Sequence, residues 1–190
     1  SFPERHLALM TMDLEMLDGD APIVISSQLL NRQDGFDEYH VRAAAMGEGL
    51  DPRKAEGFDR RVLDPQSHWA KGRRALLGYV CHESRMTLAV ATEHVLETEN
   101  PYTEESACEN DSAKHVFRIE AKAGHPIHLE KWVTYHTSRG VPVRELSDRC
   151  LRTLDRVRQD GLEQLHAEQR AWLDDFWSRA DVTTPGQPAV

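Results

Sequence analysis

Residues 141–180 read VPVRELSDRCLRTLDRVRQDGLEQLHAEQRAWLDDFWSRA and form the one long stretch of the chain with a helical period. Apolar residues recur there at steps of three and four, which is typical of an amphipathic helix. Asp160 and Gly161 interrupt the pattern, so we expect a helix in two parts. The second part has the largest apolar side chains, among them Trp172, Phe176 and Trp177. They exceed what the rest of the chain is expected to cover, which indicates a missing partner.

Before this helix, six stretches have the alternation or the composition of β-strands. They are residues 6–17, 23–30, 76–82, 86–98, 114–121 and 127–137. We expect the first two to pair as an antiparallel hairpin or meander step, and Met10, Met12 and Met16 to pack in the core. Several strands with short turns and no intervening helix favour an antiparallel β-sandwich over βαβ units. The predicted fold is therefore mainly β, with the helix as a carboxy-terminal linker.

Three segments are predicted to be loops. Residues 31–35 and 47–72 are rich in polar and turn-forming residues, and we interpret them as a contact region. Residues 97–111 contain six acids and no Lys or Arg, which favours a solvated loop over a calcium site because no turn glycine spaces the acids.

The bulk composition excludes several classes of partner. The net charge is −9, which argues against nucleic acid and anionic membranes, since both are bound through basic patches. No apolar run is long enough to cross a membrane, and there is no secretory signal. Cys81, Cys108 and Cys150 form no CxxC pair, so we predict reduced thiols, with burial favoured for Cys81 and Cys150, in a cytoplasmic protein. Because the chain opens without methionine, we expect it to start inside a longer protein.

No motif assigns chemistry to this chain. Phosphate loops, dinucleotide fingerprints, nucleophile elbows and HExxH pairs are all missing from the sequence. His125 and His128 are predicted to point apart, and His115, His128 and His136 could meet only through the tertiary fold. We therefore assign no catalytic, cofactor-binding or metal-ligating residue. Trp69 and Trp132 are candidates for stacking on a sugar ring, whereas Trp172 and Trp177 fit helix packing better.

Several short patches together resemble a known family. They are RHLAL at residues 5–9, ISSQLLNRQDG at 25–35, DPR at 51–53, and the helical Gly161 with His166, Trp172 and Trp177. In this order they resemble the amino-terminal region of glycoside hydrolase family 65, which includes maltose, trehalose and kojibiose phosphorylases and hydrolytic relatives. The resemblance extends from Ser1 to about Ala180.

The resemblance implies a mutarotase-like supersandwich, a helical linker and then an (α/α)6 catalytic barrel. On this pattern residues 1–140 are a partial sandwich, 141–181 the linker, and 182–190 the start of a connection to the absent barrel. The residues known to do chemistry in the family all lie on that barrel, so the resemblance gives this chain no catalytic position. It implies instead that the loop from Asn31 leans over the active-site end, and that Trp172 and Phe176 lie against the barrel.

We therefore expect the non-catalytic amino-terminal part of a bacterial, cytoplasmic enzyme that cleaves α-linked glucose disaccharides with inversion. Its expected partners are its own barrel and, through the whole enzyme, the disaccharide. No cofactor is expected, and inorganic phosphate is the co-substrate if the enzyme is a phosphorylase. Two alternatives remain: a free-standing carbohydrate-binding sandwich, and an oligomerisation scaffold. Homodimers or strand exchange are a further option, because a partial sandwich exposes sheet edges.

Overall fold

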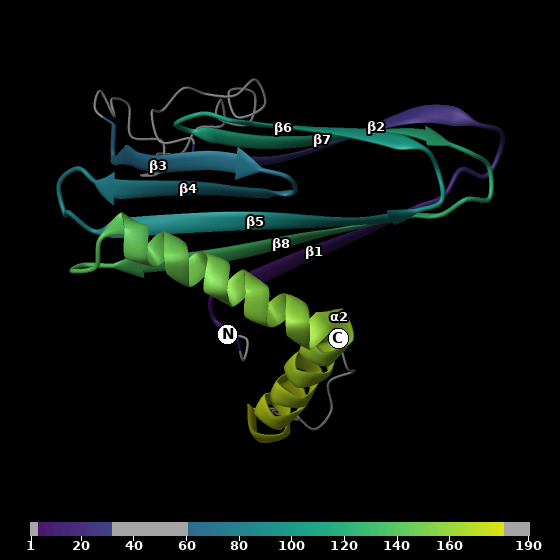
Figure 1. Ribbon diagram of the computed structural model, residues 1–190. Helices are drawn as coiled ribbons and strands as arrows, with labels where there is room; N and C mark the ends of the chain where they lie inside the picture. Colours follow the sequence, from purple (N-terminus) through teal and green to yellow (C-terminus); the bar gives the residue numbers. More distant parts are fainter. Residues whose placement is uncertain (1–3, 32–60, 181–190) are drawn as a thin grey trace, which may run out of the picture.

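The protein folds into three layers, with a helix on one face of a five-stranded sheet and a three-stranded sheet on the other (Figure 1). The structure is a computed structural model that describes residues 4–31 and 61–180. All strand pairs of both sheets are antiparallel. The predicted antiparallel sandwich with a carboxy-terminal helix is thus confirmed. The described helix has no segment long and apolar enough to span a bilayer.

The large sheet has the strand order β1-β8-β5-β4-β3. Its strands are β1 (Leu7–Leu14), β3 (Leu63–Lys71), β4 (Arg74–Cys81), β5 (Thr87–Thr98) and β8 (Ile127–Ser138). The short loop between β4 and β5 was predicted correctly, and the Cys81 N–H donates to the Met86 carbonyl there. The small sheet has the order β2-β7-β6, with β2 (Ala21–Leu30), β6 (Tyr102–Cys108) and β7 (Ser112–Ala121).

The predicted pairing of the first two strands is wrong. β1 lies in the large sheet beside β8, and β2 lies in the small sheet beside β7. The turn between them therefore carries the chain from one layer to the other. Met10 and Met12 are 55% and 37% exposed instead of buried, because β1 is an edge strand. Met16 packs as expected against the core between the sheets.

Two predicted loops contain strands. β3 occupies the end of the segment predicted as a loop over residues 47–72, and its register shifts between Pro65 and Ser67. β6 occupies the middle of the acidic segment, where Arg73 and Arg118 pair with Glu104 and Glu105. Residues 32–35 of one predicted loop and residues 47–60 of the next lie outside the described residues.

The core is split between the two faces of the large sheet. Between the sheets, Leu96, Phe117, Ile119 and Ile127 are at most 7% exposed. On the opposite face, Trp132 of β8 belongs to a second cluster together with residues of the helix. Side chains alternate along β8, so one strand serves both layers. Cys150 is buried in the second cluster as expected, whereas Cys81 is only half-buried.

Candidate docking surface on the helix

Helix α2 (Val143–Ala180) is anchored through its first half. Its buried stripe of Leu146, Cys150, Leu154 and Val157 packs on the outer face of the large sheet. The Thr134 hydroxyl of β8 donates a 3.0 Å hydrogen bond to the Cys150 carbonyl, and burial raises the pKa of the Cys150 thiol to about 11. The predicted amphipathic helix is therefore confirmed for this half, and it is fixed to the sheet.

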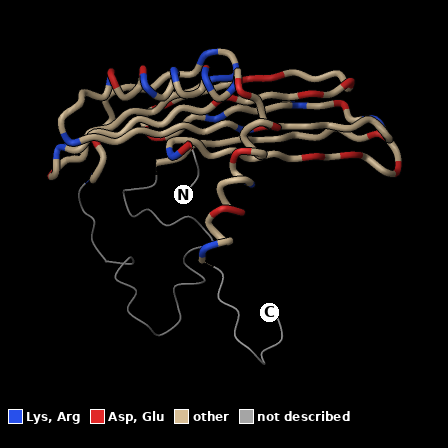
Figure 2. The backbone as a smooth tube through the Cα atoms, turned by 90° about the horizontal axis from the view of Figure 1, so that it is seen from below, with Lys and Arg blue, Asp and Glu red and all other residues tan. Residues whose placement is uncertain are grey.

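A cluster of ion pairs that includes the buried Glu130 lies beneath this half of the helix. The Glu130 carboxylate accepts a 2.7 Å hydrogen bond from the Trp132 indole N–H and a 3.1 Å bond from Arg158 of α2. The Arg158 guanidinium also lies 4.9 Å from the centre of the Trp132 ring. Arg74 of β4 bridges to Asp155 of α2 at 2.7 Å. These contacts fix the helix along the sheet as well as against it, and Figure 2 shows Lys and Arg interspersed with Asp and Glu along this half.

The helix changes direction at Gly161, as the sequence predicted. This residue has φ 80° and ψ 164°, a backbone conformation that is essentially restricted to glycine. A Cβ at this position would meet no atom within 4 Å, so the backbone angle, and not space, requires glycine. Figure 1 shows the second half turning away from the sheet.

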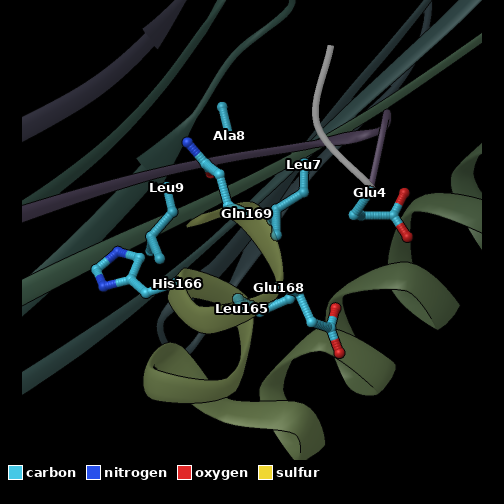
Figure 3. Close-up of a pocket in the computed structure, with 8 residues that line it drawn as sticks. All are labelled: Glu4, Leu7, Ala8, Leu9, Leu165, His166, Glu168 and Gln169. Atoms are coloured by element: carbon cyan, nitrogen blue, oxygen red, sulfur yellow. The ribbon is translucent and has the colours of Figure 1, made fainter. Parts of the chain in front are cut away.

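The second half of α2 and strand β1 enclose a groove of about 310 Å³ (Figure 3). Leu7 and Leu9 line it from β1, and Leu165, His166 and Gln169 line it from the helix. At its rim Glu4 is ion-paired with Arg156. Burial alone would raise the pKa of the Glu4 carboxyl, but hydrogen bonds from Arg156 and the His6 N–H hold it below its ordinary value. The Glu4–Arg156 ion pair thus holds the residues just before β1 against the helix.

Beyond this groove the helix presents three aromatic side chains. The ring centres of Trp172 and Phe176 lie 5.8 Å apart and stack at 8°, and Phe176 meets Trp177 edge-on at 5.1 Å. Phe176 is 41% exposed and Trp177 is 57% exposed. We call Trp172, Phe176 and Trp177 the aromatic end of α2. Exposed aromatic clusters of this kind are typical of protein contact sites.

The candidate residues from the sequence do not form one site. His115 lies between the sheets, His128 is hydrogen-bonded to Asp13 at 2.6 Å, and His136 stacks on His6 at 4.0 Å. Within residues 4–31 and 61–180, no group of three or more His, Cys, Asp or Glu side chains is placed to hold a metal. Trp132 is fully buried, so its predicted role as a sugar platform is wrong.

Trp69 is half-buried and lines a second groove of about 610 Å³, between β3 and the start of α2. Gln66, Arg144 and Asp148 lie on the same groove. An indole beside amide, guanidinium and carboxylate groups is a lining typical of small-molecule sites. Trp69 therefore remains a candidate for stacking on a sugar ring, unlike Trp132.

Sequence reasoning missed two clusters. They are the Glu130 cluster and a pair of stacked buried histidines, His94 and His115. The sequence pattern could have indicated the histidines. His94 points to the same side of its strand as the buried Leu96, and His115 points to the same side as the buried Phe117. A polar ring at an apolar strand position predicts a buried, partnered side chain.

Comparison with known proteins identifies the family. The family model described as "Glycosyl hydrolase family 65, N-terminal domain" matches residues 1–176. The chain belongs to this family. The family-65 domain is 24% identical over 190 residues to the α,α-trehalose phosphorylase of Thermoanaerobacter brockii, covering all of this chain and 23% of that protein. It is 26% identical over 188 residues to the uncharacterized glycosyl hydrolase Rv3401 of Mycobacterium tuberculosis, covering 99% of this chain and 22% of that protein.

A solved structure shares the fold. The putative kojibiose phosphorylase from human microbiome matches with a TM-score of 0.64 at 12% identity, over 90% of this chain and 20% of that one. The family-65 domain described here thus spans less than a quarter of the length of these relatives. They are longer proteins, in which this domain is one part.

Proposed function

We propose that this chain is the non-catalytic amino-terminal domain of an inverting α-glucoside phosphorylase or hydrolase, and that it supports and caps a catalytic barrel in the rest of that protein. The observation that carries the proposal is the aromatic end of α2. It lies on the last described turns of the chain, in the half of the helix that turns away from the sandwich (Figure 1), and two of its three rings are exposed. The chain belongs to family 65 and covers less than a quarter of the length of its relatives. The partner that docks on the aromatic end is therefore the remainder of the same enzyme.

The rigidity of the first half of α2 supports this role. A surface that docks another domain binds best when its position is fixed beforehand, because less conformational entropy is lost on docking. The Arg158–Glu130 and Arg74–Asp155 contacts provide that fixation. Gly161 then sets the direction in which the aromatic end leaves the sheet.

In the whole enzyme, the reaction is cleavage of an α-linked glucose disaccharide by phosphate or water. A protonated carboxylic acid on the barrel assists departure of the leaving sugar, as in inverting glycoside cleavage generally. The domain described here contributes no reacting group. It acts by holding the barrel and its substrate entrance in shape, in the cytoplasm of a bacterium, without a cofactor.

The test uses the full-length protein with the aromatic end made polar, as Trp172→Ser, Phe176→Ser and Trp177→Ser. Activity is measured on trehalose, maltose and kojibiose, as glucose 1-phosphate released with phosphate and as glucose released without it. We expect the triple variant to lose most of its activity and to melt at a lower temperature. The 190-residue chain alone should keep its own melting temperature, because these exposed rings bury little of its core.

The matched control is Val24→Ser, which polarises an exposed residue, 59% accessible, on β2 of the small sheet. This variant should leave the activity of the full-length protein unchanged. Full activity in the triple variant would contradict the docking role, and an active 190-residue chain would contradict the absence of a catalytic group.

A free-standing carbohydrate-binding role is the second candidate, and the groove beside Trp69 favours it. Its test is calorimetric titration of the 190-residue chain with maltose and trehalose. Saturable binding that Trp69→Ala abolishes would support this role. An absence of binding at millimolar sugar leaves the docking role as the one that accounts for the exposed surface.

A further inference from the structure

Two histidines occupy the middle of the sandwich, where apolar side chains usually pack. His94 belongs to β5 of the large sheet and His115 to β7 of the small sheet, and they are 4% and 5% exposed. Their ring centres lie 5.1 Å apart and stack at 26°. Phe117 closes the cluster, with its ring centre 4.6 Å from that of His115. The stacked rings thus join one sheet to the other.

The hydrogen bonds of His94 suit a neutral ring that carries its proton on Nδ1. Its Nδ1 lies 3.3 Å from the Arg73 carbonyl, which can only accept, so the proton is on Nδ1. Its Nε2 lies 2.8 Å from the Ser27 hydroxyl and accepts a hydrogen bond from it. Both ring nitrogens are satisfied in this tautomer, and Ser27 belongs to β2, so the bond is a second link between the sheets.

The surroundings of His115 do little to stabilise a positive charge on its ring. Its Nε2 is buried and has no hydrogen-bond partner among the described residues. The Glu104 carboxylate of β6 lies 4.0 Å away, and Arg73 already pairs with that carboxylate at 2.8 Å. A small cavity of about 10 Å³ beside the two rings is large enough for a single water and no more.

The charges around the pair are mostly positive. Arg73 faces it from the turn between β3 and β4, and Lys131 faces it from β8, with its ammonium group donating to the Gln28 carbonyl at 2.7 Å. Glu104 is the carboxylate that faces the pair within the described residues, and it is shared with Arg73. A second proton on either ring would therefore meet two cations, a buried neighbour and little water.

We propose that the His94–His115 pair is an acid-sensitive lock between the two sheets, which holds them together while both rings are neutral and opens the sandwich when the rings are protonated. Because the rings cannot both become charged in the closed sandwich, proton uptake must be coupled to separation of β5 from β7. The proposal does not depend on the docking role, and either can fail without the other.

The direction of the pH dependence follows from burial. Burial lowers the pKa of His94 to about 4 and also lowers the pKa of His115. In the unfolded chain both titrate near 6.5, so the unfolded state binds more protons between these values. Stability is therefore complete above about pH 6.5 and falls as the pH drops toward about 4. For His94 alone, the unfolding equilibrium constant rises roughly 70-fold between pH 7.5 and pH 4.5.

The test compares urea unfolding of the 190-residue chain at pH 7.5 and pH 4.5 with that of the double variant His94→Phe and His115→Phe. Phenylalanine keeps an aromatic ring at each position but cannot take up a proton. We expect the acid-induced increase of the unfolding constant to be smaller in the double variant by roughly 70-fold or more. An equal increase in both proteins would overturn the proposal.

Two controls isolate the pair. His166→Gln removes an exposed histidine outside the pair, and this variant should keep the large acid-induced increase of the unfolding constant. His128→Gln should change the pH dependence in the opposite sense, because the hydrogen bond to Asp13 raises the pKa of His128 and its ion pair strengthens as the pH falls.

A second measurement needs no variant and applies even if the double variant does not fold. The imidazole proton resonances of the ten histidines are followed by NMR as the pH is lowered. We expect the His94 ring to keep the chemical shifts of the neutral form at pH 5.5 while the chain is folded, and the pKa of His115 to lie below its ordinary value because of burial. Titration of all ten near pH 6.5 would overturn the proposal.

Discussion

At the scale of single residues, the carboxylate of Glu130 links the large sheet to the helix. Its side chain is 10% exposed, and it accepts hydrogen bonds from a buried indole and from Arg158 of the helix. Removal of a buried hydrogen-bond partner costs more than the bond itself is worth, because the other group stays buried without a partner. The identity of residue 130 therefore affects both the sheet and the helix.

We predict that Glu130→Ala lowers the free energy of unfolding by about 2–3 kcal/mol, because the Trp132 N–H and Arg158 both lose their acceptor. Glu130→Gln keeps one acceptor oxygen and should cost about 1 kcal/mol. Urea unfolding at pH 7 measures both values. Equal losses for the two variants would show that the acceptor has no role.

At the scale of elements, the start of α2 approaches β4 closely enough to require glycine. A Cβ on Gly78 would lie 2.5 Å from Cγ1 of Val143, which is inside van der Waals contact. The helix can lie this close to the strand because residue 78 has no side chain on that face. Val143 is 7% exposed and fills the space instead.

A double-mutant cycle tests this approach. We expect Gly78→Ala to cost about 1–3 kcal/mol through overpacking. Val143→Ala in the same chain frees the space, so the double variant should be more stable than the sum of the single variants predicts, by about 1 kcal/mol. Urea unfolding of the three variants supplies the cycle, and strict additivity would argue against the contact.

The bend of α2 gives a second prediction for this element. Gly161→Ala is expected to lower the free energy of unfolding by about 1–3 kcal/mol, because alanine adopts the backbone angles of residue 161 only under strain. Asp160→Ala is the matched control, since it changes the neighbouring residue without this strain. Thermal unfolding of both variants measures the difference, and equal midpoints would mean that the bend imposes no constraint.

The helix and most strands could be predicted from the sequence, whereas the pairing between the strands could not. Alternation along residues 127–137 gave β8 and both of its faces, because side-chain direction in a strand is a local property. The pairing of β1 with β8 was missed, since no local pattern specifies a partner more than a hundred residues away. β6 was read as a loop because its acids suggested solvation, whereas Arg73 of the β3–β4 turn and Arg118 of β7 pair with them.

The candidate site was predictable in part for the same reason. The helical period identified the aromatic end of α2 and the break at Gly161, which are both local. It could not place Trp132, whose burial depends on the helix crossing β8, or the meeting of His94 and His115 across two sheets.

At the scale of the whole molecule, one side of the sandwich is open. β1 is the last strand of the large sheet and β2 the last of the small sheet, so each has an unpaired edge among the described strands. Met10 and Met12 are exposed on β1. Natural proteins usually protect such edges with charges, bulges or a covering segment, because open edges pair with other chains.

We predict that the 190-residue chain self-associates as its concentration increases, and that Met10→Lys with Met12→Lys suppresses this association. Lysine on an edge strand opposes pairing because of its charge and its desolvation cost. Sedimentation velocity over a hundredfold range of concentration measures it. Leu17→Lys, at a turn residue that is 83% exposed, serves as the control. A wild-type chain that stays monomeric throughout would refute the prediction.

The pairing of β1 with β8 also constrains the order in which the protein can be made. Leu7 lies opposite Thr134, so β1 leaves the ribosome well before the strand with which it pairs, and the large sheet can close only after β8 has been made. Contacts between such distant parts of a chain make folding slow. Until β8 arrives, β1 is an unpaired strand on a growing chain, and α2 follows only afterwards to cover the finished face. We therefore expect the nascent domain to need protection by a chaperone for most of its synthesis.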